Sequence, residues 1–324
     1  MSFYGTVDTK PERKAMMDMK NKFLGSLIGS ALGDAIGELA FHFSSKDHLL
    51  HKLEIMKNFI YTDDTAMTVG TAASIIKTGG LDPQDLGDTF KQNFRNEPWR
   101  GYASGPPTIF SIVDRTAVPY IDAAKSLFGG KGSFGNGAAM RAAPVGLFFH
   151  DATNLYEQAR LSASVTHSHP IGIDGAAVQS KAVALALNFD PEEEFPIKDF
   201  IENLIAFAAT PEMKNKLHLL QRLLEDNSSP MHAAQQIGRS VTAHESLPFA
   251  LFSFLHHPES YAECLFCAIL NGGDRDTLGA MSGALSGAYL GLESIPLDWR
   301  VKLENRSHIE HLALKLLERR SPAL

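Results

Sequence analysis

Hydrophobic residues recur three and four positions apart over most of the chain, which is the spacing of one face of an α-helix. Glycine and proline pairs such as Gly79-Gly80 and Asp190-Pro191 separate these stretches. No run of alternating β-branched residues predicts a strand. We therefore predict an all-α fold, a single-domain orthogonal helical bundle. Its predicted helices cover residues 21–40, 64–78, 84–96, 137–149, 152–166, 172–188, 198–208, 211–225, 230–238, 247–256, 260–270, 276–291 and 303–319.

Two of the predicted helices are unusually rich in small residues. Glycine inside a helix costs about 1 kcal/mol relative to alanine, so repeated glycines suggest that another backbone must approach closely. We expect these two helices to cross tightly and to bring Asp34 near the segment 274–277. The small residues are Gly25, Ser26, Gly29, Ser30, Ala31, Gly33, Ala35 and Gly37 in the first helix, and Ala280, Gly283, Ala284, Ser286, Gly287, Ala288 and Gly291 in the second.

Composition narrows the class of protein. The net charge of −7 provides no cationic field for nucleic acid. The longest apolar stretch, residues 23–33, is too short to span a bilayer. Cys264 and Cys267 form an isolated CxxC in an apolar stretch and are interpreted as buried helix residues of a reducing compartment. We expect a soluble, cytoplasmic monomer with an N-terminal tail at residues 1–20 and one domain at residues 21–324.

Two acidic segments each precede a predicted helix. Thr62, Asp63 and Asp64 form the first, and Asp274, Asp276 and Thr277 lie in the second. N-capping explains one carboxylate in each segment, but it does not explain two carboxylates beside a threonine in both. Paired carboxylates and hydroxyls are the oxygen ligands that two neighbouring Mg²⁺ ions require. Together the segments favour a metal site over two helix caps.

A glycine-rich segment at residues 130–137 opens onto the next predicted helix. Exposed backbone N–H groups at a helix N-terminus suit a diphosphate, although an ordinary flexible turn explains the glycines equally well. Phe128 and Phe134 flank this segment and could stack on an adenine or pack in the core. Farther along, His167 is expected in a polar pocket and His169 at a helix end.

Five motifs occur in the order seen in ADP-ribosylglycohydrolases. The sequence resembles this family, which includes dinitrogenase reductase-activating glycohydrolase, the arginine- and serine-directed ADP-ribosylhydrolases and the J1 crystallins. The residues at 130–141, together with Gly101-Tyr102, are most similar to the serine-directed type. The five motifs are Gly33-Asp34-Ala35-Ile36-Gly37, Tyr61-Thr62-Asp63-Asp64-Thr65, the segment 130–141, Thr166-His167 and Gly272-Gly273-Asp274-Arg275-Asp276-Thr277.

The resemblance implies an all-α fold with a two-Mg²⁺ centre, in which Mn²⁺ could replace Mg²⁺. It also implies that ADP-ribose or an ADP-ribosylated protein is the partner. The implied metal ligands are Thr62, Asp63, Asp64, Asp274, Asp276 and Thr277. The implied diphosphate, ribose and adenine contacts are Gly132, Ser133, Phe134, Gly135, Asn136 and His167, with Phe128 beside them.

The chain departs from the family pattern at Phe41, where a glutamate is usual. In the serine-directed branch that glutamate is a metal ligand and a catalytic group. Glu38 lies three residues earlier, on the same helical face, and could replace it. Arg275 is also unusual between two aspartates, and we expect it to pair with a carboxylate or a substrate phosphate.

The implied reaction is hydrolysis at the anomeric carbon of an ADP-ribosyl group linked to serine, to arginine or in a related ADP-ribosyl conjugate. A hydrolase for a free metabolite such as O-acetyl-ADP-ribose is a further hypothesis. The catalytic candidates are Asp64, Asp63 and Glu38, with Asp64 the first choice for the base that activates water. The alternative is an ADP-ribose-binding or crystallin-like structural protein that lacks turnover because of Phe41.

Overall fold

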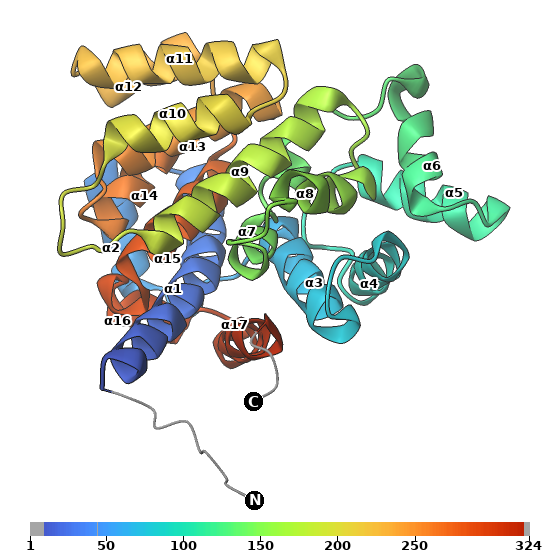
Figure 1. The fold of residues 1–324 in the computed structure, drawn as a ribbon, viewed down its shortest axis with the longest axis horizontal. Coiled ribbons are helices and arrows are strands. Elements are labelled where there is room, and N and C mark those ends of the chain that lie inside the picture. The colour runs from blue at the N-terminus through green and yellow to red at the C-terminus, as the bar shows by residue number, and fades with distance from the viewer. Residues whose placement is uncertain (1–9, 44, 321–324) are drawn as a thin grey trace, which may run out of the picture.

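The computed structural model describes residues 10–43 and 45–320 (Figure 1). In these residues it contains α- and 3₁₀-helices and isolated bridges but no strands, which confirms the all-α prediction. The first half contains α1 (Lys10–Ala40), α2 (Lys46–Ile55), α3 (Asp63–Thr78), α4 (Pro83–Asn96), α5 (Gly105–Thr116), α6 (Tyr120–Ser126), η1 (Leu127–Gly130), η2 (Asn136–Ala138), α7 (Ala143–Phe148) and α8 (Leu155–Ser164). The second half contains α9 (Pro170–Asn188), α10 (Ile197–Phe207), α11 (Pro211–Glu225), α12 (Pro230–Ile237), α13 (Ala243–His256), α14 (Tyr261–Leu270), α15 (Arg275–Leu290), η3 (Leu292–Ser294), α16 (Leu297–Lys302) and α17 (Arg306–Arg320).

Helices α1 and α15 lie antiparallel in the centre of the molecule, as their small residues predicted. A Cβ atom added to a glycine of one helix would overlap the backbone of the other helix at every turn, so only glycine permits this contact. The contact brings Asp34 of α1 to the N-terminal end of α15. The facing positions are Gly25 with Gly287, Gly29 with Gly283, Gly33 with Gly279, and Gly37 with Arg275.

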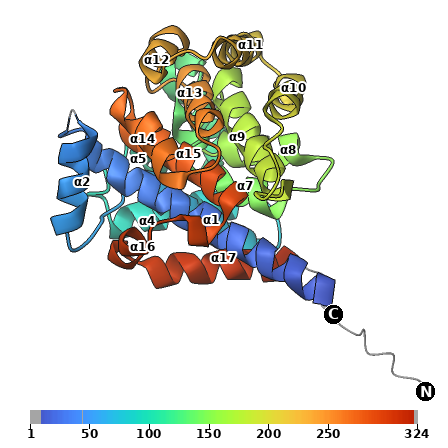
Figure 2. The same cartoon turned by 90° about the vertical axis from the view of Figure 1, so that its left-hand side faces the viewer.

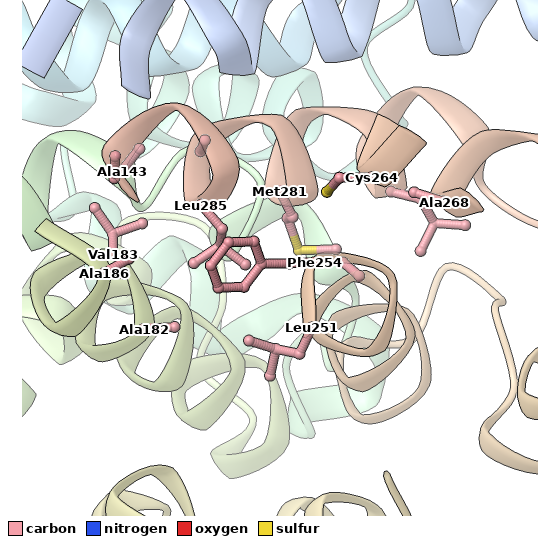
Figure 3. Packing of buried hydrophobic residues seen from close by; sticks show 14 of the residues in the cluster. Ala143, Ala182, Val183, Ala186, Leu251, Phe254, Cys264, Ala268, Met281 and Leu285 are labelled. Carbon is pink, nitrogen blue, oxygen red and sulfur yellow. The ribbon is translucent and has the colours of Figure 1, made fainter. Parts of the chain in front are cut away.

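The other helices cover this central pair. In Figure 1, α9 to α13 lie on one side and α3 to α6 on the other, while Figure 2 shows α17 running beside α1. Met281 and Leu285 of α15 pack against Leu251 and Phe254 of α13 in the main core (Figure 3). Cys264 and Cys267 of α14 are buried free thiols, as predicted. Burial raises the pKa of both thiols, that of Cys267 to about 11.

The ends of several elements differ from the sequence prediction. Helix α1 begins at Lys10, inside the expected tail, while residues 1–9 of that tail lie outside the described residues. The stretch Met16–Ala40 of α1 is long and apolar enough to cross a membrane, whereas we expected the longest apolar stretch to be residues 23–33 and too short to span a bilayer. However, 83% of its most apolar window is buried inside the protein, so these side chains form the core.

Four short helices escaped prediction, namely α2, α5, α6 and α16. Each buries only one to three side chains, too few for a clear helical period, as in α16, where only Trp299 is buried. In α5, Pro106 and Pro107 lie in the first turn, a position to which proline is well suited, so here a proline pair does not separate helices. The single helix predicted over 137–149 is instead η2, a turn and α7.

Candidate active site

The two acidic segments meet because α3 and α15 both begin beside the C-terminal half of α1. Helix α3 presents Asp63 and Asp64 in its first turn, and α15 presents Asp276. Thr277 Oγ1 donates to Asp64 Oδ1 at 3.4 Å, which joins the two segments directly. These side chains line one end of a cavity of about 320 Å³. Residues that line this cavity include Asp63, Asp64, Gly101, Ser104, Phe128, Ser133, Gly135, Asn136, His167, Asp274, Asp276 and Thr277.

Asp34 is the buried residue that fixes the first acidic segment. Its carboxylate accepts hydrogen bonds from the backbone and the hydroxyl of Thr62, the latter at 2.8 Å. It also accepts from the backbone and the hydroxyl of Thr65, at 3.0 and 2.6 Å. Burial raises the pKa of Asp34 to about 6 despite these bonds, which favour its charged form. Asp34 therefore orients Thr62 and the start of α3, a role that we had not assigned to it.

Helix capping does not account for the aspartates of this site. In α3 the cap is Thr62, whose hydroxyl accepts from the backbone N–H of Asp64 at 3.3 Å. Asp274 occupies the cap position of α15, but its side chain makes no capping bond. It accepts instead from Asn136 Nδ2 at 2.7 Å. Asp63 and Asp64 therefore have no structural task as caps, whereas Asp276 Oδ1 accepts from the backbone N–H of Thr277 at 2.9 Å.

Burial and the repulsion between neighbouring carboxylates disfavour the charged form of the aspartates in this site. Burial raises the pKa of Asp63 to about 7 and that of Asp276 to about 8, and neighbouring carboxylates add to both shifts. The pKa of Asp64 lies well above its ordinary value, first because of burial and then because of Asp276, Asp34, Asp63 and Asp274. Asp64 Oδ2 is buried without a hydrogen-bond partner. An unpaired buried carboxylate oxygen among repelling carboxylates is suited to a cation.

The donor atoms of this end of the cavity fit a hard divalent cation. They are carboxylate and hydroxyl oxygens, which Mg²⁺ and Mn²⁺ prefer. Within the described part of the chain, no three His, Cys, Asp or Glu side chains are already placed to hold one ion. The arrangement places the acids in one cavity wall, where binding of an ion would relieve their mutual repulsion.

The glycine-rich segment lies at the other end of the cavity. The backbone N–H of Asn136 donates to Val241 O at 2.9 Å, and Asp274 N–H donates to Arg239 O at 3.1 Å. The segment 239–243 therefore ties the glycine-rich segment to the start of α15. This connection could not be predicted from the sequence, because both contacts are made by backbone atoms.

The predicted substrate contacts divide into two groups. Those that line the cavity are Phe128, Ser133, Gly135, Asn136 and His167. Gly132 and Phe134 do not line it, since Gly132 packs against Ser168 and the ring of Phe134 meets that of His169 edge-on at 5.5 Å. His169 caps α9, as expected for a helix-end role, and its Nδ1 accepts from Ile171 N–H at 3.2 Å.

His167 is held in one tautomer by two residues behind it. Arg141 is fully buried, and its Nη2 donates to Thr166 Oγ1 at 2.8 Å. Thr166 Oγ1 also lies 2.8 Å from His167 Nδ1. Arg141 can only donate, so Thr166 Oγ1 accepts from it and its own hydroxyl proton is available for His167 Nδ1. His167 Nδ1 is then the acceptor, and the ring proton of His167 lies on Nε2. Burial, with a smaller effect of Arg141, lowers the pKa of His167 to about 3, so the ring is neutral and Nε2–H is a donor on the cavity side, near Gly135 and Gly137.

Glu38 and Phe41 lie at the C-terminal end of α1. Glu38 is exposed and lines a second hollow together with Asp63 and Asp276. Phe41 follows the last helical residue and is 46% exposed, and its N–H donates to Glu38 O at 3.3 Å. The structure therefore places a carboxylate near the acids, although it comes from Glu38 and not from position 41.

Two features of the site were missed or misassigned from sequence. The loop at 100–106 lines the cavity, and its Arg100 O accepts from Asp63 N–H at 2.7 Å. The available sequence signal was Gly101-Tyr102, quoted above only for its resemblance to the serine-directed type, and Gly101 adopts a positive φ of 87°. Among the residues that the structure describes, Arg275 pairs with no carboxylate, contrary to expectation. Its Nη1 donates to the carbonyl oxygens of Ala40 and Phe43, closing the C-terminal end of α1.

Comparison with known proteins agrees with this geometry. Residues 15–323 match the model of the family described as ADP-ribosylglycohydrolase. The chain is 32% identical to ADP-ribosylhydrolase ARH3 of Mus musculus, over 79% of this chain and 76% of the relative. It is 26% identical to ADP-ribosyl-[dinitrogen reductase] glycohydrolase of Rhodospirillum rubrum, over 75% of this chain and 73% of that protein.

The fold is also found among solved structures. An ADP-ribosylglycohydrolase-related protein complex superposes with a TM-score of 0.74, covering 94% of this chain and all of that chain at 24% identity. The sequence match spans nearly the whole chain and includes both acidic segments and the glycine-rich segment. The protein is thus a member of the ADP-ribosylglycohydrolase family.

Proposed function

We propose that the protein is a divalent-metal-dependent ADP-ribosylhydrolase that releases ADP-ribose from a modified protein side chain. The observation that carries this proposal is a cavity with two chemically different ends. At one end, buried aspartates repel one another and Asp64 Oδ2 has no partner. At the other end, His167 and the glycine-rich segment present donors that suit a diphosphate, while Asn136 joins this segment to the acids through its bond to Asp274. A sugar diphosphate would contact both ends of the cavity, with its anomeric carbon at the aspartates and its diphosphate at the donors.

Six residues would hold the cations, namely Thr62, Asp63, Asp64, Asp274, Asp276 and Thr277. Two Mg²⁺ ions, or Mn²⁺ in their place, would supply positive charge for the ribose hydroxyls and the departing group. Asp34 and Asn136 keep two of these residues in place through their bonds to Thr62 and Asp274.

Asp64 is the first candidate for the base. It is fully buried between the two segments, and its Oδ2 is free to accept a proton from water. Nearby positive charge lowers the pKa of a carboxyl group, so the ionised form that a base requires is favoured once the site is loaded. Water would attack the anomeric carbon as the bond to the acceptor breaks, and the acceptor would leave with a proton.

Turnover of defined conjugates tests the proposal. We expect release of ADP-ribose from at least one of a serine-linked peptide, an arginine-linked peptide and O-acetyl-ADP-ribose. Release should stop in EDTA and return with Mg²⁺ or Mn²⁺, because only the cations supply positive charge for the departing group and lower the pKa of the base. Calorimetry would run in parallel. Binding of ADP-ribose without release from any conjugate would overturn the hydrolase and support an ADP-ribose-binding protein.

The tautomer of His167 gives a second prediction. Thr166→Val keeps the shape of the side chain but removes the hydroxyl that fixes the proton on Nε2. We expect about a tenfold weaker affinity for ADP-ribose, the equivalent of one hydrogen bond of about 1.4 kcal/mol. Calorimetry measures the affinity, and the ¹⁵N shifts of His167 report the tautomer. Thr108→Val, on the exposed side of α5, is the control. Unchanged affinity and unchanged shifts would remove Thr166 from this role.

A further inference from the structure

A second hollow, of about 370 Å³, lies beside the candidate active site. Asp63, Gly101 and Asp276 line both spaces, so these residues form the boundary between them. Glu38 lines only the second hollow, whereas Asn136 and His167 line only the first. The carboxylates of Asp63 and Asp276 therefore face two chemically different spaces, while Asp64 faces only the first.

The chemistry of the substrate sets which part enters which space. The diphosphate needs the donors of the first cavity, namely the glycine-rich segment and His167. The anomeric carbon must then lie at Asp63 and Asp276, where the two spaces meet. The group bonded to that carbon lies opposite the diphosphate, so it points into the second hollow.

The rim of the second hollow is apolar and exposed. Trp99 is 70% exposed and Ile60 is 61% exposed, and Leu39 and Met56 lie beside them. We refer to Leu39, Met56, Ile60 and Trp99 as the acceptor surface. A small leaving group such as acetate needs no such surface. Exposed tryptophan next to aliphatic side chains is typical of the central contacts of protein interfaces.

The charge of this hollow is negative. Arg100 is its only cationic lining residue among those described, and Arg100 is already paired with Glu97 and Glu304. Glu38, Asp63 and Asp276 remain without a cationic partner there. Two cations would neutralise the inner aspartates more than the exposed Glu38, which lies at the rim. A basic residue near the modified side chain would complement Glu38.

Resting on the proposed function, we infer that the acceptor surface docks the polypeptide that carries the ADP-ribosyl group, with a basic residue of that polypeptide next to Glu38. The docking surface provides specificity for protein conjugates over small ones. It holds the modified side chain at Asp63 and Asp276 without taking part in the bond cleavage.

The test compares two substrates that are both cleaved at the anomeric carbon but have leaving groups of different size, so O-acetyl-ADP-ribose is used as its 1″-O-acetyl isomer. Trp99→Ala, Ile60→Ala and the double variant are assayed on an ADP-ribosylated peptide with lysine beside the modified residue and on O-acetyl-ADP-ribose. We expect kcat/KM for the peptide to fall about tenfold in each single variant and further in the double variant. The value for O-acetyl-ADP-ribose should change less than twofold. Met231→Ala, a similarly exposed apolar residue on α12, is the control and should leave both values unchanged.

The charge is tested on the peptide itself. Replacing its lysine with glutamate should lower kcat/KM with the wild-type protein, and Glu38→Gln should reduce this preference. An equal loss on both substrates, or no loss on the peptide, would overturn the docking surface while leaving the hydrolase intact. If the wild-type protein hydrolysed neither substrate, the proposed function and the docking surface would fall together.

Discussion

Asp64→Asn should lose turnover almost completely, with kcat lower by about 10²- to 10⁴-fold, the usual contribution of a general base. The change removes the carboxylate that lies between the two acidic segments and bonds to Thr277. Asparagine has the same shape, so the fold should be retained. Initial rates at saturating Mg²⁺ measure the loss. Asp226→Asn, an exposed aspartate at the end of α11, is the matched control. Full activity of Asp64→Asn would remove Asp64 from the mechanism.

The same substitution should stabilise the metal-free protein, with a gain that depends on pH. The pKa of Asp64 in the folded state is well above its unfolded value near 4. Below pH 4 the Asp64 carboxyl is protonated in both the folded and the unfolded protein, so it does not change the free energy of unfolding. As pH rises toward the folded pKa, the unfolded state releases its proton first and the folded state becomes less stable.

Thermal unfolding in EDTA between pH 4 and 9 measures this effect. The Tm difference between Asp64→Asn and the wild type should be near zero at pH 4 and should grow through the range in which Asp63 and Asp276 also titrate, with pKa values of about 7 and 8. Mg²⁺ should raise the Tm of the wild type more than that of the variant, since it binds the native state through these carboxylates. A lower Tm for the variant at pH 8 in EDTA would show that Asp64 stabilises the fold.

The sequence was most informative at positions where only one type of residue satisfies a physical requirement of the fold. Only glycine allows α1 and α15 to touch at Gly33 and Gly279, so the small-residue pattern predicted their contact and the meeting of the acidic segments. Carboxylates at two helix starts were likewise recognisable, because one cap per helix cannot explain them. Here sequence and structure agree.

Prediction failed where backbone atoms or long-range bonds decide the arrangement. Asp34 has the same sequence signal as any buried acid, and its four donors from Thr62 and Thr65 appear only in three dimensions. Arg275 was expected to find an anion, but the carbonyls at the end of α1 lie closer. Helix α6 buries only Tyr120, Ala123 and Ala124, which is too short a pattern to detect.

Phe41→Glu should increase activity and Mg²⁺ affinity by about ten- to a hundredfold, the range in which supporting residues tune metal sites. The family resemblance places a metal-binding glutamate at this position, and Phe41 is exposed enough for replacement to cost little core packing. Its backbone is fixed by the bond to Glu38 O and by Arg275, which binds the neighbouring carbonyls. A glutamate there would therefore add its charge at a defined point just beyond the C-terminal end of α1.

The role of Glu38 decides the size of this gain. If Glu38 already replaces the usual glutamate, Glu38→Gln alone should reduce turnover strongly, and adding Phe41→Glu should restore it. If Glu38 only faces the acceptor, Glu38→Gln should leave the hydrolysis of O-acetyl-ADP-ribose unchanged, and Phe41→Glu should increase it in both backgrounds. His42→Glu adds the same charge one residue later and is the control for non-specific attraction of Mg²⁺. The site would need no glutamate at this end of α1 if His42→Glu gave an equal gain. The same conclusion would follow if Phe41→Glu gave no gain and Glu38→Gln kept full activity.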